Sequence, residues 1–157
     1  LPMASLRAVC RRHPEQGFHL PGADSVKVYG EAHALIVDPS VDVIVVVAPP
    51  LYSPEICRLA VQARKPLLVE KPLATTAADA RTMVAREAGI PLMTAQTLRF
   101  DRTIQHMKRF QSSLGRSLEF NAVFQIEIRK TAPDHVAGYG KRGALLEIGV
   151  HMLDLVR

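Results

Sequence analysis

The sequence predicts an α/β protein: an incomplete, doubly wound parallel sheet, followed by the start of an α+β domain with a mostly antiparallel sheet. In residues 1–114, short apolar runs alternate with amphipathic helical segments, the pattern of parallel strands joined by helices. One run, Val41–Ala48, is almost continuous Val and Ile, as in a strand covered on both faces. Residues 117–128 instead alternate apolar and polar side chains, which is typical of an antiparallel strand with one buried face. We therefore expect a second domain to begin with residues 115–157.

The individual elements of the first domain follow from the same patterns. Strands are expected at residues 6–10, 25–30, 41–48, 66–72 and 90–96. Helices are expected at residues 31–38, 53–65, 75–89 and 102–115, and a last helical pattern covers 144–157. Residues that favour helix ends support these limits, with N-caps at Ser53 and Thr76, Pro54 at a first helical position, and stops at Gly89 and Gly115.

Composition narrows the class of protein. With 48% hydrophobic and 22% charged residues, the chain resembles an ordinary soluble domain, and its most apolar run, VDVIVVVAPPLY, is too short to span a membrane. The net charge is +5, but the basic residues are scattered, so a solvated surface or a small anionic ligand is favoured over nucleic acid. Cys10 and Cys57 lack metal-ligand spacing. We expect both to be reduced core thiols in a cytoplasmic protein without a metal site.

The segment GYGKRG, residues 138–143, has the glycine spacing of a dinucleotide-binding turn. Such a turn needs a buried strand before it and a helix after it, so that the pyrophosphate meets the helix N-terminus. The residues before Gly138, RKTAPDHVA, are polar and contain a proline. We therefore interpret the segment as a loop ahead of the last helix, where the glycines allow close approach of the backbone.

Three strand ends, CRR, APP and EKP, reach the edge at which doubly wound sheets bind ligands. The most specific of them is Glu70-Lys71-Pro72. Pro72 favours an extended backbone at Lys71 and so restricts where its ammonium points. A lysine held in this way can hydrogen-bond a substrate hydroxyl and lower the pKa of that hydroxyl during oxidation. The alternative is a charged surface turn.

The last helical pattern carries a second candidate site. In a helix, Glu147, His151 and Asp154 fall at positions i, i+4 and i+7 and share one face. A carboxylate one turn before a histidine can orient the imidazole and tune it for proton transfer. The alternative is a solvated polar stripe. A metal site is disfavoured, because no second His or Cys lies at ligand spacing.

In this order, the motifs VDVIVVVAPP, EKPLATT, LRFD and GALLEIGVHMLD resemble the glucose–fructose oxidoreductase/inositol dehydrogenase family, Gfo/Idh/MocA. The similarity covers nearly the whole chain. It implies a Rossmann-type nucleotide-binding domain followed by an α+β domain with a large, mostly antiparallel sheet. It also implies that the family's first strand and glycine turn lie before LRAVC. We therefore expect this chain, which begins at Leu1, to be a fragment.

The resemblance assigns roles to residues of this sequence. Catalysis and substrate contact fall to Lys71, His151 and Glu147, with His151 as the acid/base and Glu147 where the family usually has Asp. Further substrate contacts would come from Thr97 and Asp154. The cofactor would contact Lys71 as well as the set Ala48, Pro49, Pro50, Glu70, Pro72 and Arg99. Ser53 stands where the family often has His, which indicates a subgroup difference.

Cofactor choice is suggested by the end of the first strand. An acid there would bind the ribose 2′-hydroxyl, but Arg11 and Arg12 follow Cys10. Arginine suits a 2′-phosphate through paired hydrogen bonds, so NADP(H) is favoured over NAD(H). The alternative is that both are surface arginines of a turn.

Two functions remain open from the sequence. The first is an NAD(P)-dependent oxidoreductase that transfers a hydride between nicotinamide and a hydroxyl carbon of a sugar, polyol or related compound. The second is a non-catalytic truncated or regulatory family member that binds a nucleotide or sugar without turnover. Small molecules are the expected partners, and the full-length protein is expected to be a homo-oligomer.

Overall fold

The computed structural model describes residues 4–21, 25–83, 89–116, 119–125 and 143–156. All five expected strands are present, each shorter than its apolar run: β1 (Ala8–Cys10), β2 (Lys27–Tyr29), β3 (Ile44–Val46), β4 (Leu67–Val69) and β5 (Leu92–Thr94). Every pairing is parallel. The ladders form two groups, β1–β2 and β3–β4–β5. The α/β class with parallel strands is thus confirmed.

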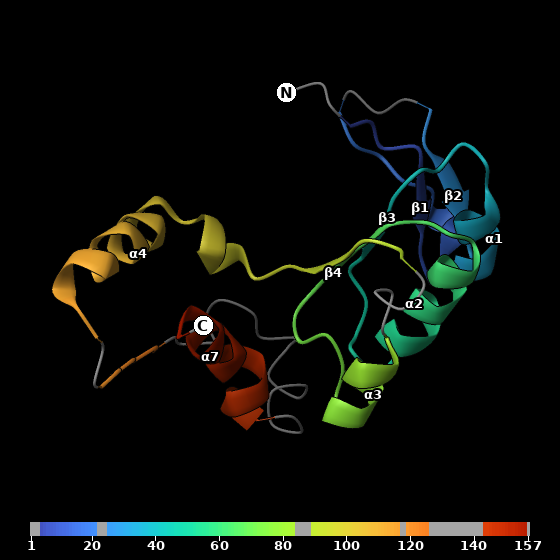
Figure 1. The fold of residues 1–157 in the computed structure, drawn as a ribbon. Helices are drawn as coiled ribbons and strands as arrows, with labels where there is room; N and C mark the ends of the chain where they lie inside the picture. The colour runs from blue at the N-terminus through green and yellow to red at the C-terminus, as the bar shows by residue number, and fades with distance from the viewer. Residues whose placement is uncertain (1–3, 22–24, 84–88, 117–118, 126–142, 157) are drawn as a thin grey trace.

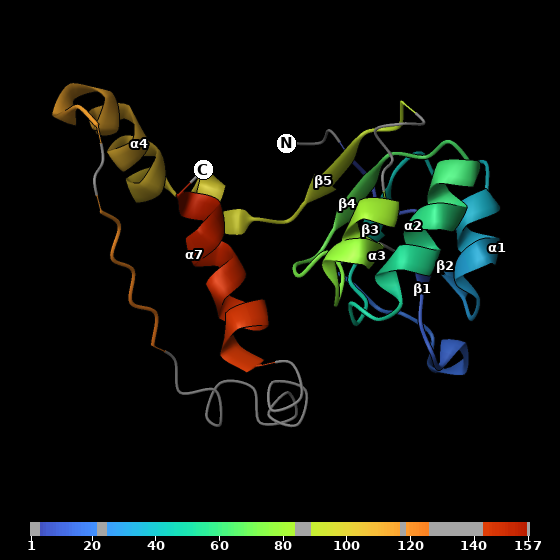
Figure 2. The ribbon, with the colours of Figure 1, turned by 60° about the horizontal axis from the view of Figure 1, so that its bottom comes forward.

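The helices of the first domain lie side by side along the sheet (Figures 1 and 2). They are α1 (Ala32–Val37), α2 (Ser53–Gln62) and α3 (Ala77–Thr82). A 3-10 turn, η1 (Pro14–Gln16), follows β1, and another, η2 (Thr97–Phe100), leads from β5 into α4 (Arg102–Leu114). The final segment comprises a π-helical turn, η4 (Leu145–Gly149), and α7 (Val150–Leu155), which stands between the sheet and α4 in Figure 2.

One buried cluster joins α1 and α2 to the strands. Cys57 and Ala60 of α2 and Val69 of β4 are fully buried, and Ile36 of α1 is 1% exposed. Apolar side chains at these positions are removed from water by the helix layer, which is the main favourable contribution to folding here. No helix in the described ranges is long and apolar enough to cross a membrane.

The other face of β3 differs from the prediction. Ile44 and Val46 are buried, but Val43, Val45 and Val47 are 53%, 61% and 78% exposed. Successive side chains of a strand point to opposite faces, and within the described residues the helices α1, α2 and α3 cover only one of them. The expectation that Val41–Ala48 is covered on both faces is therefore wrong for the described part of the chain.

Helix ends agree with the sequence at most positions. The Thr76 hydroxyl accepts a hydrogen bond from the Asp79 backbone N–H at 3.0 Å, as an N-cap does. Gly115 ends α4 with φ of +83°, in the region that favours glycine. Ser53, expected as an N-cap, instead lies inside α2 and is buried, and Tyr52 takes the position before the helix.

Two further expectations need correction. Residues 119–125 form no strand and pair with none of the described strands, whereas a stable sheet needs several paired strands. The rest of the alternating pattern, residues 117–118 and 126–128, lies outside the described residues, as do residues 138–142 of the glycine segment. Cys57 is buried and burial raises its pKa to about 11, but Cys10 is exposed rather than part of the core, because it ends β1 at the sheet edge.

A carboxylate network fixes the turn after α1. Asp38 is 6% exposed. Its Oδ2 accepts hydrogen bonds from Lys27 Nζ at 2.8 Å and Tyr29 Oη at 2.7 Å, and its Oδ1 accepts from the Ser40 backbone N–H and hydroxyl at 2.8 and 2.7 Å. These donors, Lys27 first, hold the pKa of Asp38 well below its ordinary value of 3.8. The network therefore joins β2 to the C-terminal end of α1.

We predict that the Asp38→Asn substitution lowers the thermal midpoint of the intact protein at neutral pH. The folded-state pKa of Asp38 is lowered, so its stabilising contribution is present above pH 3.8 and is lost as the pH falls below it. The difference in midpoint between wild type and variant should therefore shrink in acid. Asp42→Asn is the matched control, since Asp42 is exposed. Equal midpoints for wild type and Asp38→Asn at pH 7 would contradict the assignment.

Candidate active site

The carboxyl end of β4 brings a lysine against the last helix. Lys71 follows the buried strand residue Val69 by two positions. Its Nζ donates a hydrogen bond to the Glu147 carbonyl oxygen at 2.9 Å and lies 3.7 Å from Glu147 Oε2. The Lys71 and Glu147 side chains are 21% and 7% exposed. The structure therefore brings together two predicted site residues that are 76 positions apart in the chain.

The neighbours of Lys71 in the EKP motif shape this strand end. Glu70 Oε2 accepts a hydrogen bond from the Lys71 backbone N–H at 3.1 Å. The Lys71–Pro72 peptide bond is cis, which the sequence analysis did not anticipate. Pro72 itself is buried.

Glu147 lies on a π-helical turn rather than on a regular α-helix. The turn η4 spans Leu145–Gly149 and passes directly into α7. Single π-helical turns within helices are frequent at functional sites, because they change the direction of side chains and carbonyls. The sequence predicts one continuous α-helix here, and hydrophobic periodicity over so few residues does not separate the two geometries.

His151 lies on α7, two residues after the π-helical turn ends at Gly149. Its Nδ1 is buried and has no hydrogen-bond partner among the described residues. Burial lowers the pKa of His151 below its ordinary value of 6.5, and the Lys71 ammonium lowers it further, whereas Asp154 and Glu70 raise it. The imidazole is therefore neutral at pH 7 and is able to accept a proton.

Asp154, three residues after His151 on α7, forms an ion pair with Arg99. Arg99 Nε and a terminal guanidinium nitrogen donate to the two carboxylate oxygens of Asp154, both at 2.6 Å. This two-pronged contact joins η2 to α7 across 55 positions of sequence. It is a finding beyond the sequence analysis, which assigns Arg99 to cofactor and Asp154 to substrate; those assignments stay predictions.

Gln96 is a residue that the sequence analysis did not identify. Its Oε1 is buried and, like His151 Nδ1, has no hydrogen-bond partner among the described residues. β5 pairs with β4 so that Val69 lies opposite Thr94, and Gln96 follows Thr94 by two positions at the carboxyl end of β5. Buried polar atoms are normally paired, so Gln96 Oε1 and His151 Nδ1 are candidate contacts for a ligand. In the segment PLMTAQT, residues 91–97, no motif marks the glutamine for this role.

The remaining predicted contacts lie at neighbouring strand ends. After β3, Ala48 is half-buried, Pro49 exposed and Pro50 buried, and the Pro49 carbonyl accepts from the Tyr52 backbone N–H at 2.9 Å. Thr97 is exposed at the start of η2. Because the carboxyl ends of parallel strands share one edge, these residues border the Lys71 site.

The two arginines after β1 differ in what they contact. Arg11 Nη1 donates to the Gly17 carbonyl at 2.6 Å and Nη2 to Gln16 Oε1 at 3.0 Å, so its guanidinium holds the turn that contains η1. Arg12 is exposed, and its side chain forms no hydrogen bond or ion pair identified among the described residues. Of the two, Arg12 is the arginine whose guanidinium remains available to a ligand.

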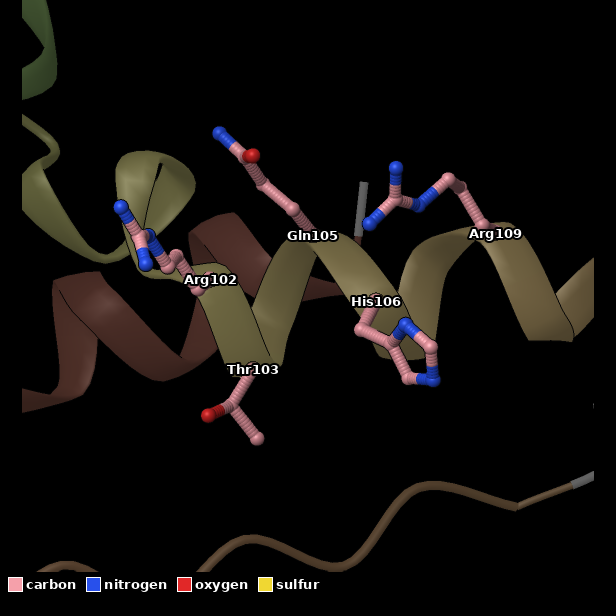
Figure 3. A pocket seen from close by; sticks show the side chains of 5 residues that line it. All are labelled: Arg102, Thr103, Gln105, His106 and Arg109. Carbon is pink, nitrogen blue, oxygen red and sulfur yellow. The ribbon is translucent and has the colours of Figure 1, made fainter.

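A separate hollow lies on α4, away from this edge. It has a volume of about 520 Å³, is open to solvent and is lined by side chains of that one helix, as Figure 3 shows for Arg102, Thr103, Gln105, His106 and Arg109. Within the described residues, no group of three His, Cys, Asp or Glu side chains is placed to hold a metal ion.

Comparison with known proteins tests the resemblance. The model of the Gfo/Idh/MocA oxidoreductase family, NAD-binding Rossmann fold, matches residues 2–94. Myo-inositol 2-dehydrogenase from Thermotoga maritima is 30% identical over 138 residues, which are 83% of this chain and 40% of that enzyme. The 1,5-anhydro-D-fructose reductase from Ensifer adhaerens is 35% identical over 136 residues, 78% of this chain and 39% of that enzyme.

The solved structures agree with these relatives. An oxidoreductase from Agrobacterium radiobacter, in complex with NAD+, L-tartaric acid and magnesium, superposes with a TM-score of 0.78 at 25% identity, over 96% of this chain and 46% of that one. The chain thus spans less than half the length of the relatives that it matches. Its motifs, its parallel sheet and these similarities agree, and the chain belongs to the Gfo/Idh/MocA oxidoreductase family with its NAD-binding Rossmann fold.

Proposed function

We propose that the protein transfers a hydride between NAD(P) and a hydroxyl carbon of a sugar, polyol or related compound. The observation that carries this proposal is the convergence of the Lys71 ammonium with the neutral, half-buried imidazole of His151 at the carboxyl edge of the sheet. The names of the relatives, a myo-inositol dehydrogenase and an anhydrofructose reductase, support the substrate class.

The site suits a nicotinamide nucleotide. In open α/β sheets, ligands bind beyond the carboxyl ends of the strands, where Ala48, Pro49 and Pro50 follow β3 and Lys71 follows β4. The unpartnered Gln96 Oε1 and His151 Nδ1 offer hydrogen-bonding positions at that edge. When bound, the nicotinamide supplies the carbon that accepts or donates the hydride.

The chain's own residues then handle the proton. In the oxidation direction, His151 accepts the proton of the substrate hydroxyl while the hydride leaves the carbon that bears this hydroxyl. The imidazole can accept the proton because its lowered pKa keeps it neutral at pH 7. The Lys71 ammonium stabilises the alkoxide that develops on that oxygen. Glu147, whose carbonyl oxygen and carboxylate both lie near Lys71 Nζ, holds that ammonium at the strand end.

We predict that His151→Asn lowers kcat in the full-length protein by about 10²- to 10⁴-fold, the usual contribution of a general acid–base. The measurement is steady-state oxidation of a panel of polyols and sugars with NAD+ and NADP+. His106→Asn, on the exposed surface of α4, is the matched control and should keep wild-type turnover. A wild-type protein that binds nucleotide but turns over no member of the panel would favour the non-catalytic alternative.

We also expect kcat/KM for oxidation to rise with pH through the pKa of His151, which lies below 6.5. Replacing Lys71 by Gln removes a charge that lowers this pKa, so the acidic limb of the profile should move to higher pH while the rate at its plateau falls. Lys108→Gln is the control, because it removes a lysine charge from an exposed position on α4 and should leave the limb in place. A limb that stays in place in Lys71→Gln would argue against a direct effect of Lys71 on the imidazole.

NADP(H) preference is the finer part of the proposal, and it rests on Arg12. Arg12→Gln should weaken NADPH binding by about 10- to 100-fold, the value of one charge-assisted contact, and leave NADH binding almost unchanged. Arg7→Gln, just before β1, is the control. Fluorescence titration of the full-length protein gives both constants, and wild-type protein that binds NADH as tightly as NADPH would refute the preference.

A further inference from the structure

Two cationic side chains from the nucleotide-binding half hold the segment that carries His151, one on each side of the imidazole. Before His151, Lys71 contacts Glu147 on η4. After it, Arg99 contacts both carboxylate oxygens of Asp154 on α7, one helical turn from His151. Along its segment, His151 therefore lies between two contacts, each of which joins residues that are far apart in sequence.

The Arg99–Asp154 contact differs from an ordinary surface ion pair. The Asp154 side chain is only 12% exposed, whereas Arg99 remains 48% exposed. Isolated surface pairs contribute little, but loss of one partner of a largely buried pair leaves a charge without compensation. Two parallel hydrogen bonds also fix the orientation of the carboxylate.

We propose that Arg99 and Asp154 are a positioning pair, which holds α7 against the nucleotide-binding half and in which Arg99 offsets the charge of Asp154 at the His151 imidazole. This proposal deepens the proposed function and rests on it for the role of His151. It assigns neither residue to contact with substrate or cofactor.

The charges around His151 give the two halves of the pair opposite effects. The imidazole is faced by Glu70 and Lys71 from the end of β4 and by Asp154 from its own helix. Glu147 is in contact with Lys71, and Arg99 from η2 acts through Asp154. Asp154 raises the proton affinity of the imidazole. Without Arg99, the carboxylate of Asp154 raises the proton affinity of the imidazole further; without Asp154, that contribution is lost and the Arg99 guanidinium remains nearby.

The test is the pKa of His151 in the full-length protein, followed by NMR of labelled histidine and assigned by the loss of its signal in His151→Asn. Arg99→Gln should raise this pKa, Asp154→Asn should lower it, and the double variant should fall between the two. Arg102→Gln, an exposed arginine three positions on, is the control for loss of a positive charge and should shift it least. Both single variants should also lower kcat/KM at pH 7 by about tenfold or more, through displacement of the imidazole.

A purely mechanical contact gives a different result. If the pair only holds α7 in place, either single substitution breaks the same contact, and the pKa of His151 should move in the same direction in both variants. That result overturns the proposal, and so does the absence of a shift in both variants. Should Arg99→Gln fail to fold, Arg99→Lys keeps the charge and removes the two-pronged contact, and it should place the pKa closer to wild type than Asp154→Asn does.

Failure of the proposed function and failure of the positioning pair give different experimental results. A full-length protein that oxidises no sugar or polyol would refute the function, yet opposed shifts of the His151 pKa would still establish the pair. Conversely, an active enzyme in which both single variants shift the pKa alike would refute the pair and leave the function intact.

Discussion

The contact between Lys71 and Glu147 is the interaction on which the candidate site depends. β4 ends at Val69 in the core, so the backbone that leads to Lys71 is fixed by the sheet. Glu147 belongs to a segment 76 positions later. By accepting the Lys71 hydrogen bond on its carbonyl, that segment brings His151 to the strand edge. Together with the Arg99–Asp154 contact, it joins the lysine and the histidine from two distant parts of the chain.

The sequence predicts the local structure well, because local structure depends on nearby residues. All five strands are where β-branched and apolar runs place them, and Thr76 and Gly115 end helices as their chemistry favours. The family could also be inferred, since the EKP and GALLEIGVHMLD motifs keep their order and spacing. The candidate site residues Lys71, Glu147 and His151 were identified in the same way.

What sequence reasoning missed depends on contacts between distant residues or on small geometric differences. The Arg99–Asp154 pair cannot be deduced from either residue's neighbours, and nothing local marks Gln96 as unpartnered. The π-helical turn at Glu147 and the α-helix expected there have the same apolar pattern over five residues. The exposure of Val45 was missed because a run of valines is the same in sequence whether one face of the strand is covered or both.

The sequence separation of the two contacts that hold α7 also orders events during synthesis. Lys71 and Arg99 leave the ribosome 76 and 55 residues before their respective partners. At ordinary elongation rates, Lys71 precedes Glu147 by about 4 to 15 seconds, which is long compared with the folding of a small α/β unit. The parallel strands can therefore form while both cations are still hydrated. His151 therefore reaches the strand edge after the strands that form that edge.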